Sequence, residues 1–412
     1  MTDAPGASRT DRSGSPAAGA GLRTLVVTSA AAVPPVSGAD LRNYQNARAL
    51  AQLGPVTLVS VGPLRDGHSL AREIQIAALS SRGEPRGRSL NPWRSRVEPR
   101  IPRAAIPRLL DIARTVSPDI VLVEGVGLAA LIAPLRPFAR LLVLDMHNVE
   151  SLLAPHVFPS RFREKFLPHG WTNAGRARRL ERKALAEVDR VWVCSDIDRD
   201  RLVSLFAPNI PVDVVPNGIP RADRLPTSLP VLQGQADGWP VLLLLGHLAY
   251  PPNVTAAQRL AREILPRIRR AFPAARVILA GREPVPEVER LASLAGVELV
   301  ANPEDTSSLL ARSHISVIPL SAGGGTRIKI LEAMAWGLPV VATSVAVEGQ
   351  GFEDGKEILI VGTDEALADA VTALCAEPDR LERQRRLAYE KVVLRYGPSV
   401  IEEAVRKGLG EI

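Results

Sequence analysis

The sequence predicts an α/β protein made of two doubly wound, Rossmann-like units. Short apolar runs alternate with helical segments from residue 22 onward, the alternation stops over residues 218–239, and it then begins again. Continuous apolar strands separated by helices are typical of a parallel sheet that is covered on both faces. With 412 residues, of which 46% are hydrophobic, the chain is long enough to build two such cores.

The first unit is predicted over residues 22–217. Its strands are the apolar runs 22–29, 56–61, 120–124, 141–145, 191–194 and 212–215, and a helix over 39–53 follows the first of them. Residues 1–21 are predicted to be a disordered tail, because they are rich in alanine, glycine, serine and proline and lack the apolar core of a signal peptide. The apolar stretch 119–135 is interrupted by Glu124 and by glycine and proline, so a membrane span is not expected there.

The second unit is predicted over residues 240–392, after a proline-containing linker at 218–239. Its strands are the runs 241–245, 276–280, 297–300, 315–318, 339–342 and 358–360, and a helix over 255–271 lies between the first two. Residues 393–412 end the chain with a helix that must bury the face carrying Ile401 and Val405. The pattern alone leaves open whether this helix covers the second unit or the first.

The charge balance favours an anionic partner. The chain has 51 Lys and Arg against 44 Asp and Glu, which gives a formal net charge of +7. Aromatic residues make up 4% of the chain and do not interleave with a basic stripe, so nucleic acid is not an expected partner. Only two cysteines occur, Cys194 and Cys375, far apart in the sequence, which fits a reducing cytoplasm and argues against a disulfide framework.

Unusual residues follow the predicted strands, at the sheet edge where doubly wound folds bind their ligands. They are residues 34–38, His147 with Asn148, residues 216–218, Gly246 with His247, Gly281 with Arg282, and residues 321–326. A lone histidine at such a position is commonly a hydrogen-bonded structural residue, but it can also donate to a ligand. His147 and His247 are therefore candidate site residues.

The sharpest motif is the run Gly323, Gly324, Gly325 and Thr326 between a predicted strand and the helix that begins near residue 327. Glycines let backbone N–H groups approach an anion, and the start of a helix adds unpaired donors and the positive end of its dipole. Arg327 and Lys329 stand in the first helical turn, where an anionic partner would offset the unfavourable dipole. The alternative is a tight turn with two solvated cations.

Glu332 favours the anion-binding interpretation. It lies three residues after Lys329, on the same helical face, and points back toward the glycine loop. A carboxylate there can accept hydrogen bonds from sugar hydroxyls while the loop binds phosphates, which is the arrangement a nucleotide requires.

Several kinds of site are not indicated by the sequence. There is no Asp-x-Asp motif after a strand and no His/Cys cluster with metal-ligand spacing, so no metal is expected. The Gly-x-Ser-x-Gly elbow of serine hydrolases, the Walker pattern of ATPases and the Gly-x-Gly-x-x-Gly fingerprint of NAD enzymes are also missing.

Two basic segments are candidates for contact with an anionic membrane or an acidic acceptor. Residues 82–103 contain seven arginines against two glutamates, and residues 161–183 form a basic helical stretch with aromatic residues. The alternative for each is a solvated surface segment. If the first interpretation holds, the protein is cytoplasmic with a peripheral contact at the inner face of the membrane.

These motifs together resemble the retaining glycosyltransferases of family 4, which have the GT-B fold of two facing Rossmann-like domains. The matching segments are residues 34–38, 145–148, 215–218, 245–247 with 252–253, and above all 323–342, and the resemblance covers about residues 22–410. The sequence of residues 323–335 is similar to one branch of that family, with the pattern Gly-Gly-Gly-Thr-Arg-x-Lys-x-x-Glu.

The resemblance implies a metal-independent transfer of a sugar from a nucleoside diphosphate sugar, such as a UDP- or GDP-sugar, with no other cofactor. It implies that Glu332 binds the ribose, that residues 324–326 with Arg327 and Lys329 bind the diphosphate, and that Gly38 approaches the phosphate from the first domain. The implied catalytic residues are Arg327 and Lys329, which stabilise the charge of the departing diphosphate, and His147, which contacts the donor sugar or supports the transition state. Gly38, Asn217, Gly246, His247, Gly281 and Gly323 complete the implied donor site. The acceptor is expected to be a glycan, a lipid-linked molecule or a small molecule, and the C-terminal helix is expected to cross back to the first domain.

Two departures from the family pattern concern the phosphate and sugar contacts. Gly324 stands where many members have a glutamate, and His247 and Tyr250 stand where many have arginine and lysine. The glycine-loop branch shares these changes, and they leave the acid that contacts the sugar unassigned.

Two other functions stay open at this point. A nucleotide-sugar 2-epimerase shares the GT-B layout and would need carboxylates for proton transfer, for which Glu124 and Glu150 are the candidates in the first unit. A non-catalytic subunit that binds sugar nucleotides would lose the phosphate and ribose groups, whereas residues 323–332 look intact.

Overall fold

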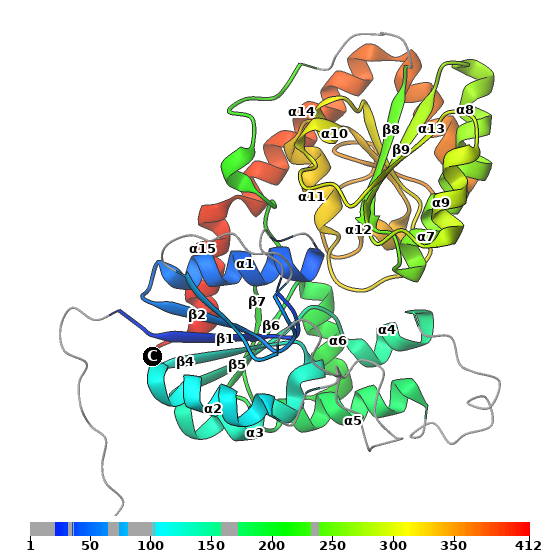
Figure 1. Ribbon diagram of the computed structural model, residues 1–412. Coiled ribbons are helices and arrows are strands. Elements are labelled where there is room, and N and C mark those ends of the chain that lie inside the picture. Colours follow the sequence, from blue (N-terminus) through cyan, green and yellow to red (C-terminus); the bar gives the residue numbers. More distant parts are fainter. Residues whose placement is uncertain are drawn as a thin grey trace, which may run out of the picture.

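The computed structural model describes residues 21–31, 35, 37–64, 74–80, 101, 104–157, 172–231 and 239–412. It consists of two domains, each a parallel sheet with helices on both faces (Figure 1). The predicted fold class, two Rossmann-like units of the α/β type, is confirmed. The tail at residues 1–20 and most of the basic segment 82–103 lie outside the described residues.

The first domain contains a seven-stranded sheet in the order β3-β2-β1-β4-β5-β6-β7. Its strands are β1 (Thr24–Thr28), β2 (Val56–Ser60), β3 (Ile74–Ala78), β4 (Ile120–Glu124), β5 (Leu141–Met146), β6 (Arg190–Val193) and β7 (Val212–Val214). Its helices are α1 (Gly38–Ala51), α2 (Ala105–Val116), η1 (Val126–Leu131), α3 (Ile132–Leu135), η2 (Arg136–Phe138), α4 (Glu150–Val157), α5 (Asn173–Leu185) and α6 (Asp196–Phe206).

Each face of this sheet has its own apolar core, because side chains alternate across a strand. Leu25 and Val27 of β1 face the core shared with α2, η1 and α3, whereas Val26 faces the core shared with α1. Helix α1 begins at a capping box in which Ser37 and Asp40 each accept a hydrogen bond from the other's backbone N–H. This cap directs the N-terminal end of α1 toward the carboxyl ends of the strands.

The second domain contains a six-stranded sheet in the order β10-β9-β8-β11-β12-β13. Its strands are β8 (Val241–His247), β9 (Arg276–Arg282), β10 (Val297–Ala301), β11 (Ile315–Ile318), β12 (Val340–Ala342) and β13 (Leu359–Ile360). Its helices are α7 (Pro251–Arg259), η6 (Leu260–Ile264), α8 (Leu265–Ala271), α9 (Pro286–Glu289), η7 (Arg290–Ser293), α10 (Ser307–Ala311), α11 (Ile328–Ala335), α12 (Ser344–Val347), α13 (Asp364–Ala376) and α14 (Pro378–Tyr396).

The strand boundaries differ from the sequence predictions at two places that matter for the site. Strands β8 and β9 continue two residues beyond their predicted ends, through Gly246-His247 and Gly281-Arg282. Strand β3 was not predicted, because it lies at the edge of the sheet, buries only Ile74 of its five residues and forms no continuous apolar run.

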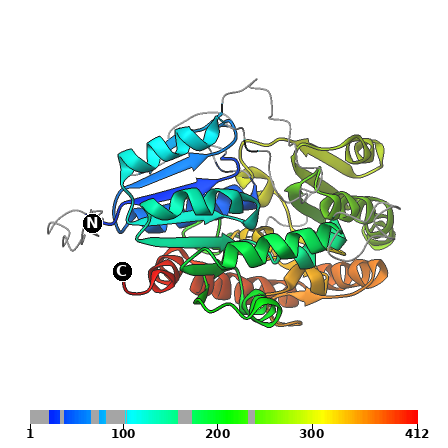
Figure 2. The ribbon, with the colours of Figure 1, turned by 90° about the horizontal axis from the view of Figure 1, so that it is seen from below.

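The chain crosses between the domains twice. Residues 215–221 lead from β7 toward the second domain, where η5 (Ala222–Arg224) follows, and α14 leads back to α15 (Pro398–Leu409). The two crossings are adjacent, because the Ile219 N–H donates to the carbonyl of Tyr396 over 2.9 Å. Figures 1 and 2 show α15, in red, lying along the first domain.

Helix α15 completes the core of the first domain. Ile401, Val405 and Leu409 are buried with Trp192 of β6, whose Nε1 donates to the carbonyl of Gly408 over 2.7 Å. Among the described residues, no helix is both long enough and apolar enough to cross a lipid bilayer.

Candidate functional site

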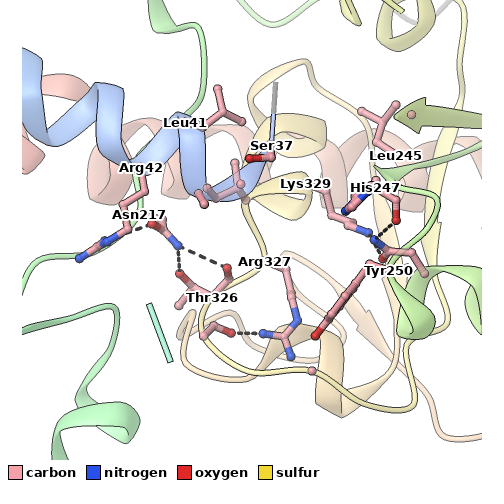
Figure 3. Close-up of a pocket in the computed structure, with 18 of the residues that line it drawn as sticks. Ser37, Leu41, Arg42, Asn217, Leu245, His247, Tyr250, Thr326, Arg327 and Lys329 are labelled. Carbon is pink, nitrogen blue, oxygen red and sulfur yellow. Dashed lines mark hydrogen bonds between the residues drawn. The ribbon is translucent and has the colours of Figure 1, made fainter. Parts of the chain in front are cut away.

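A cavity of about 600 Å³ lies between the domains, at the carboxyl ends of both sheets. Every residue that the sequence predicted for the site lines it, and Figure 3 shows part of this lining. From the first domain and the crossing come Gly38, His147 and Asn217; from the second come Gly246, His247, Gly281, Gly323, Gly324, Gly325, Thr326, Arg327, Lys329 and Glu332. The structure thus brings together residues that are up to 294 positions apart (332 − 38).

The glycine loop packs directly against the first domain. A Cβ atom on Gly324 would lie 2.6 Å from Asn148 Oδ1, and one on Gly325 would overlap the carbonyl oxygen of His147. Gly325 also has φ of +62°, which disfavours any residue with a side chain. The triple glycine therefore lets the two domains approach closely, in addition to the phosphate contact predicted for it.

A buried chain of hydrogen bonds connects this loop to the centre of the first domain. The Nδ2 of Asn217 donates to Thr326 Oγ1 over 2.7 Å, and the Oδ1 of Asn217 accepts from Arg42 Nη1 over 3.1 Å. Arg42 in turn pairs with Asp145 at 2.6 Å, and both side chains are 1% exposed. Burial alone would raise the pKa of Asp145, but the adjacent guanidinium lowers it to about 2. The predicted Asn217 thus acts as the link between the domains.

Arg327 is bound to the loop itself. It is the residue before the first turn of α11, and its Nη1 donates to the carbonyls of Gly324 and Gly325, while its Nη2 donates to the carbonyl of Val345 over 3.2 Å. In Figure 3 its guanidinium is turned toward the loop carbonyls, with the ring of Tyr250 beside it. In this arrangement Arg327 stabilises the loop conformation.

Lys329 is a half-buried cation without a carboxylate partner among the described residues. Its Nζ donates to Asn253 Oδ1 over 2.7 Å. Burial, reinforced by the positive charge of Arg327, lowers the pKa of Lys329 to about 7. A Cβ atom on Gly246 would lie 2.9 Å from this Nζ, and one on Gly281 would overlap the carbonyl of Gly246. Gly246 thus leaves room for the lysine at the cavity wall, and Gly281 leaves room for the backbone of Gly246.

Glu332 is held by two donors at one oxygen. Its Oε1 accepts from Arg221 Nη1 over 2.7 Å and from Thr306 Oγ1 over 2.8 Å. Burial raises the pKa of Glu332, and the charge of Arg221 opposes that shift. Its predicted face toward the cavity agrees with its position in the lining.

His147 lies next to two acidic residues. Its Nε2 is 3.5 Å from Asp145 Oδ2 and 3.6 Å from Glu124 Oε1. Burial opposes the charged imidazole, but the two carboxylates outweigh it and raise the pKa of His147. His247, by contrast, is at the exposed rim, where its Nε2 lies 3.0 Å from Glu283 Oε2.

The two carboxylates considered for proton transfer border a second, smaller cavity of about 140 Å³ beside His147. Glu124 Oε2 accepts from Thr28 Oγ1 and from the Ser29 N–H. Glu150 lies within 3.4 Å of Asn148 Nδ2, and burial raises its pKa. Glu124 is thus tied to β1, while Glu150 also lines the main cavity.

Sequence reasoning missed three residues that shape the site: Arg42, Arg221 and Thr306. Arg42 stands four residues after Gly38, so its place on the cavity side of α1 could have been found from the helical period. Arg221 and Thr306 stand in irregular segments, and no pattern in the sequence marks them. Among the described residues, no three His, Cys, Asp or Glu side chains are grouped as a metal site would require.

Of the two basic segments, part of one is described. Residues 172–183 include most of α5, which exposes Arg179, Arg182 and Lys183, and residues 161–171 lie outside the described part.

Two facing Rossmann-like domains with a cavity at the carboxyl ends of their strands define the GT-B class of fold. Similar solved structures include HepE of Anabaena in complex with UDP and glucose, with a TM-score of 0.66 and 16% identity over 95% of this chain and 100% of that chain. WaaG, a glycosyltransferase involved in lipopolysaccharide biosynthesis, has a TM-score of 0.69 and 14% identity over 94% and 100%. Sucrose-phosphate synthase of Thermosynechococcus elongatus has a TM-score of 0.69 and 15% identity over 93% and 97%. At these identities the likeness shows the fold.

Sequence comparison gives the family type. The model for Glycosyltransferase Family 4 matches residues 36–223, and the model for Glycosyl transferases group 1 matches residues 239–377. A phosphatidyl-myo-inositol mannosyltransferase of Propionibacterium freudenreichii is 30% identical over 200 residues, 46% of this chain and 49% of the relative. One of Mycobacterium leprae is 28% identical over 202 residues, 47% of this chain and 52% of the relative. The matches span about half the length of these relatives, and together with the two family models they support a glycosyltransferase of the family 4 type.

Proposed function

We propose that the protein transfers a sugar from a nucleoside diphosphate sugar to an acceptor hydroxyl, with retention of anomeric configuration and without a bound metal ion. The observation that carries the proposal is the interdomain cavity, where Lys329 and the glycine loop line the same space as Glu332. A cation and free amides suit a diphosphate, and a carboxylate suits the ribose hydroxyls.

In this proposal the donor spans the cavity along α11. The Gly324–Thr326 amides and Lys329 bind the diphosphate, and Glu332 accepts hydrogen bonds from the ribose. His147 and Gly38 contact the donor from the first domain. Gly246 and Gly281 keep the wall open beside Lys329.

Stabilisation of the leaving diphosphate depends on the protonation state of Lys329. When the bond between the sugar C1 and the phosphate oxygen breaks, its electron pair stays on the diphosphate, and negative charge grows at that oxygen. A protonated Lys329 and the loop amides stabilise this charge without a metal ion. The acceptor oxygen forms the new bond to C1 on the face that the diphosphate leaves, and its proton passes to the departing phosphate oxygen.

In this proposal the first domain binds the acceptor. The mannosyltransferase relatives are named for phosphatidyl-myo-inositol, which supports a lipid-linked acceptor and a peripheral contact of a cytoplasmic protein with the inner membrane face. A glycan or small-molecule acceptor is the other outcome. Replacement of Arg94, Arg96 and Arg100 with Ser should reduce binding to anionic liposomes and acceptor turnover, and unchanged values for both would refute this assignment.

The first experiment is a thermal-shift screen with UDP, GDP, ADP and their common sugar conjugates, each with and without EDTA. A ligand at 100 times its dissociation constant stabilises the folded state by about 2.7 kcal/mol, which is readily seen in such a screen. A shift with one base that EDTA does not change is the expected result. If no nucleotide shifts the transition, a sugar nucleotide is not the ligand.

Product analysis separates transfer from epimerisation. The stabilising donor is incubated alone and with candidate acceptors, and the products are followed by NMR, which reports the anomeric configuration. A retained linkage in an acceptor-dependent product supports the transferase. A new epimer of the donor, formed without acceptor, would instead assign Glu124 and Glu150 to proton transfer, because these carboxylates lie beside His147.

A further inference from the structure

Arg221 occupies an unusual position in the segment that connects the two domains. Its Nη1 donates to Glu332 Oε1 over 2.7 Å and to Thr306 Oγ1 over 3.0 Å, and Thr306 Oγ1 itself donates to the same Glu332 oxygen. The three side chains come from the crossing segment, the N-terminal end of α10 and the middle of α11. They close a triangle of hydrogen bonds at the wall of the cavity.

This triangle is largely shielded from solvent. The side chains of Arg221 and Glu332 are 17% and 9% exposed. A carboxylate in such surroundings tends toward its neutral form, and the burial of Glu332 does raise its pKa, with Arg221 as the main opposing charge. Without Arg221, this carboxylate would more readily take a proton and would lose the partner that fixes its orientation.

The two carboxylate oxygens of Glu332 differ in their hydrogen bonds. Oε1 accepts both hydrogen bonds, and Oε2 has no hydrogen-bond partner among the described residues. Glu332 lines the cavity, so its second oxygen is available to a ligand there. An ionised, oriented carboxylate oxygen accepts hydrogen bonds from hydroxyl groups and binds ligands that lack those hydroxyls less well.

The backbone before Arg221 is anchored to both domains. The Gly218 N–H donates to Gln45 Oε1 of α1, and the Ile219 N–H donates to the carbonyl of Tyr396 in α14 over 2.9 Å. Arg221 itself adopts φ of +50°, a conformation that disfavours residues with a side chain and that persists where the surrounding contacts enforce it. The guanidinium is therefore directed at Glu332 by a segment that touches both domains.

We propose that Arg221 is a positioning residue that fixes the orientation of Glu332, and that it thereby makes the site selective for ribonucleotides over deoxyribonucleotides. This inference rests on the proposed function, since it takes the ribose of the donor as the ligand of Glu332. The segment that connects the domains, residues 215–221, would then contribute to donor recognition.

The test measures discrimination, not affinity alone. Dissociation constants are determined by calorimetry for the diphosphate among UDP, GDP and ADP that stabilises the protein most, and for its 2′-deoxy and 3′-deoxy counterparts. The wild type should bind the ribonucleotide about tenfold to a hundredfold more tightly than a deoxy form, the range expected for a hydrogen bond to a charged group. Arg221→Ala should reduce this ratio to below about threefold, and Arg221→Lys should restore part of it.

Arg224→Ala is the matched control, since it removes the same charge from the same segment, three residues away and outside the triangle. It should keep the wild-type ratio. A purely structural role for Arg221 would weaken all the ligands equally and leave the ratio unchanged. If Arg221→Ala does not fold, as judged by circular dichroism and its melting curve, Arg221→Lys and Thr306→Val carry the test, and both should lower the ratio.

The outcomes distinguish the ribose assignment of Glu332 from the positioning role of Arg221. If the wild type binds these nucleotides without discrimination, the ribose assignment of Glu332 fails, and the inference fails with it. If the wild type discriminates and the Arg221 variants discriminate equally well, the inference is wrong and the proposed function stands.

Discussion

Donor binding should depend on pH through Lys329. In the free cavity its pKa is lowered to about 7 by burial and by the charge of Arg327. A bound diphosphate would place negative charge beside the ammonium group and move its pKa back toward the ordinary value of about 10.4. Binding therefore takes up a proton whenever Lys329 is neutral beforehand.

The sign and size of the effect follow from this linkage. Below pH 7 the lysine is already charged, so the dissociation constant is flat; above pH 7 the protein must first bind a proton, so affinity falls as pH rises. The expected loss is about tenfold for each pH unit above 7, or about 1.4 kcal/mol per unit, until the pKa of the complex is reached. Between pH 6 and pH 8 the dissociation constant should rise about tenfold.

The ligand for this experiment is the intact nucleotide sugar, since free UDP or GDP has a terminal phosphate that itself titrates near pH 6. Calorimetry in two buffers of different ionisation enthalpy counts the protons taken up. About half a proton per site is expected at pH 7, and about 0.9 at pH 8.

Lys329→Met is the control, because it keeps the length of the side chain and removes the titrating group. The variant should bind weakly, with little dependence on pH, whereas a contribution from His147, whose pKa is raised, would persist in it. A wild-type dissociation constant that is constant from pH 6 to pH 9, or an equal slope in the variant, would refute the assignment of Lys329 to the phosphates.

Three further predictions concern single substitutions. Glu332→Ala should weaken nucleotide binding by about 1.5–3 kcal/mol while the protein still folds, with a lower melting temperature because Arg221 loses its partner, and unaltered affinity by calorimetry would contradict the ribose assignment. Asp145→Asn leaves Arg42 buried without its charged partner and should lower the free energy of unfolding by about 3–5 kcal/mol, as chemical denaturation would show; a loss below about 1 kcal/mol would contradict this. Gly281→Ala should destabilise the end of β9, since its Cβ would overlap the carbonyl of Gly246, and it should reduce donor affinity together with the melting temperature; a wild-type melting curve would show that the strand adapts.

The fold could be predicted because its cause is local. Each parallel strand buried on both faces forms a continuous apolar run. Of the thirteen strands in the described part of the chain, twelve were predicted, and β3 was not. Strand β3 was missed because an edge strand buries fewer side chains, and only Ile74 of its five residues is buried. β13 is short, at Leu359–Ile360, and the prediction placed its start one residue early.

The site could be predicted in part. The residues after each strand meet at one cavity because parallel strands end at the same edge of a sheet, and this holds for all the predicted site residues. The contacts among them depend on the approach of the two domains, which no local pattern encodes. The glycine run was predicted as a phosphate loop, whereas its approach to His147 and Asn148 became visible in the structure.

Arg42 and Arg221 illustrate what a sequence does not show. Each is a charged residue that the structure buries against a carboxylate more than a hundred positions away, Asp145 for Arg42 and Glu332 for Arg221. Charged residues mostly lie at the protein surface, so a sequence pattern predicts an exposed side chain wherever it does not reveal the partner. Such pairs form only in the folded chain, where residues distant in the sequence meet.

The position of α15 has a consequence for biosynthesis. Ile401, Val405 and Leu409 cover a face of the first sheet beside Trp192, yet the ribosome makes them after the whole second domain. During synthesis this apolar face of the first sheet stays exposed until about 180 further residues, those of the linker and the second domain, have been added. The first domain should therefore depend on chaperones more than the second does, and removal of α15 should yield aggregation of nascent chains in place of a shorter active protein.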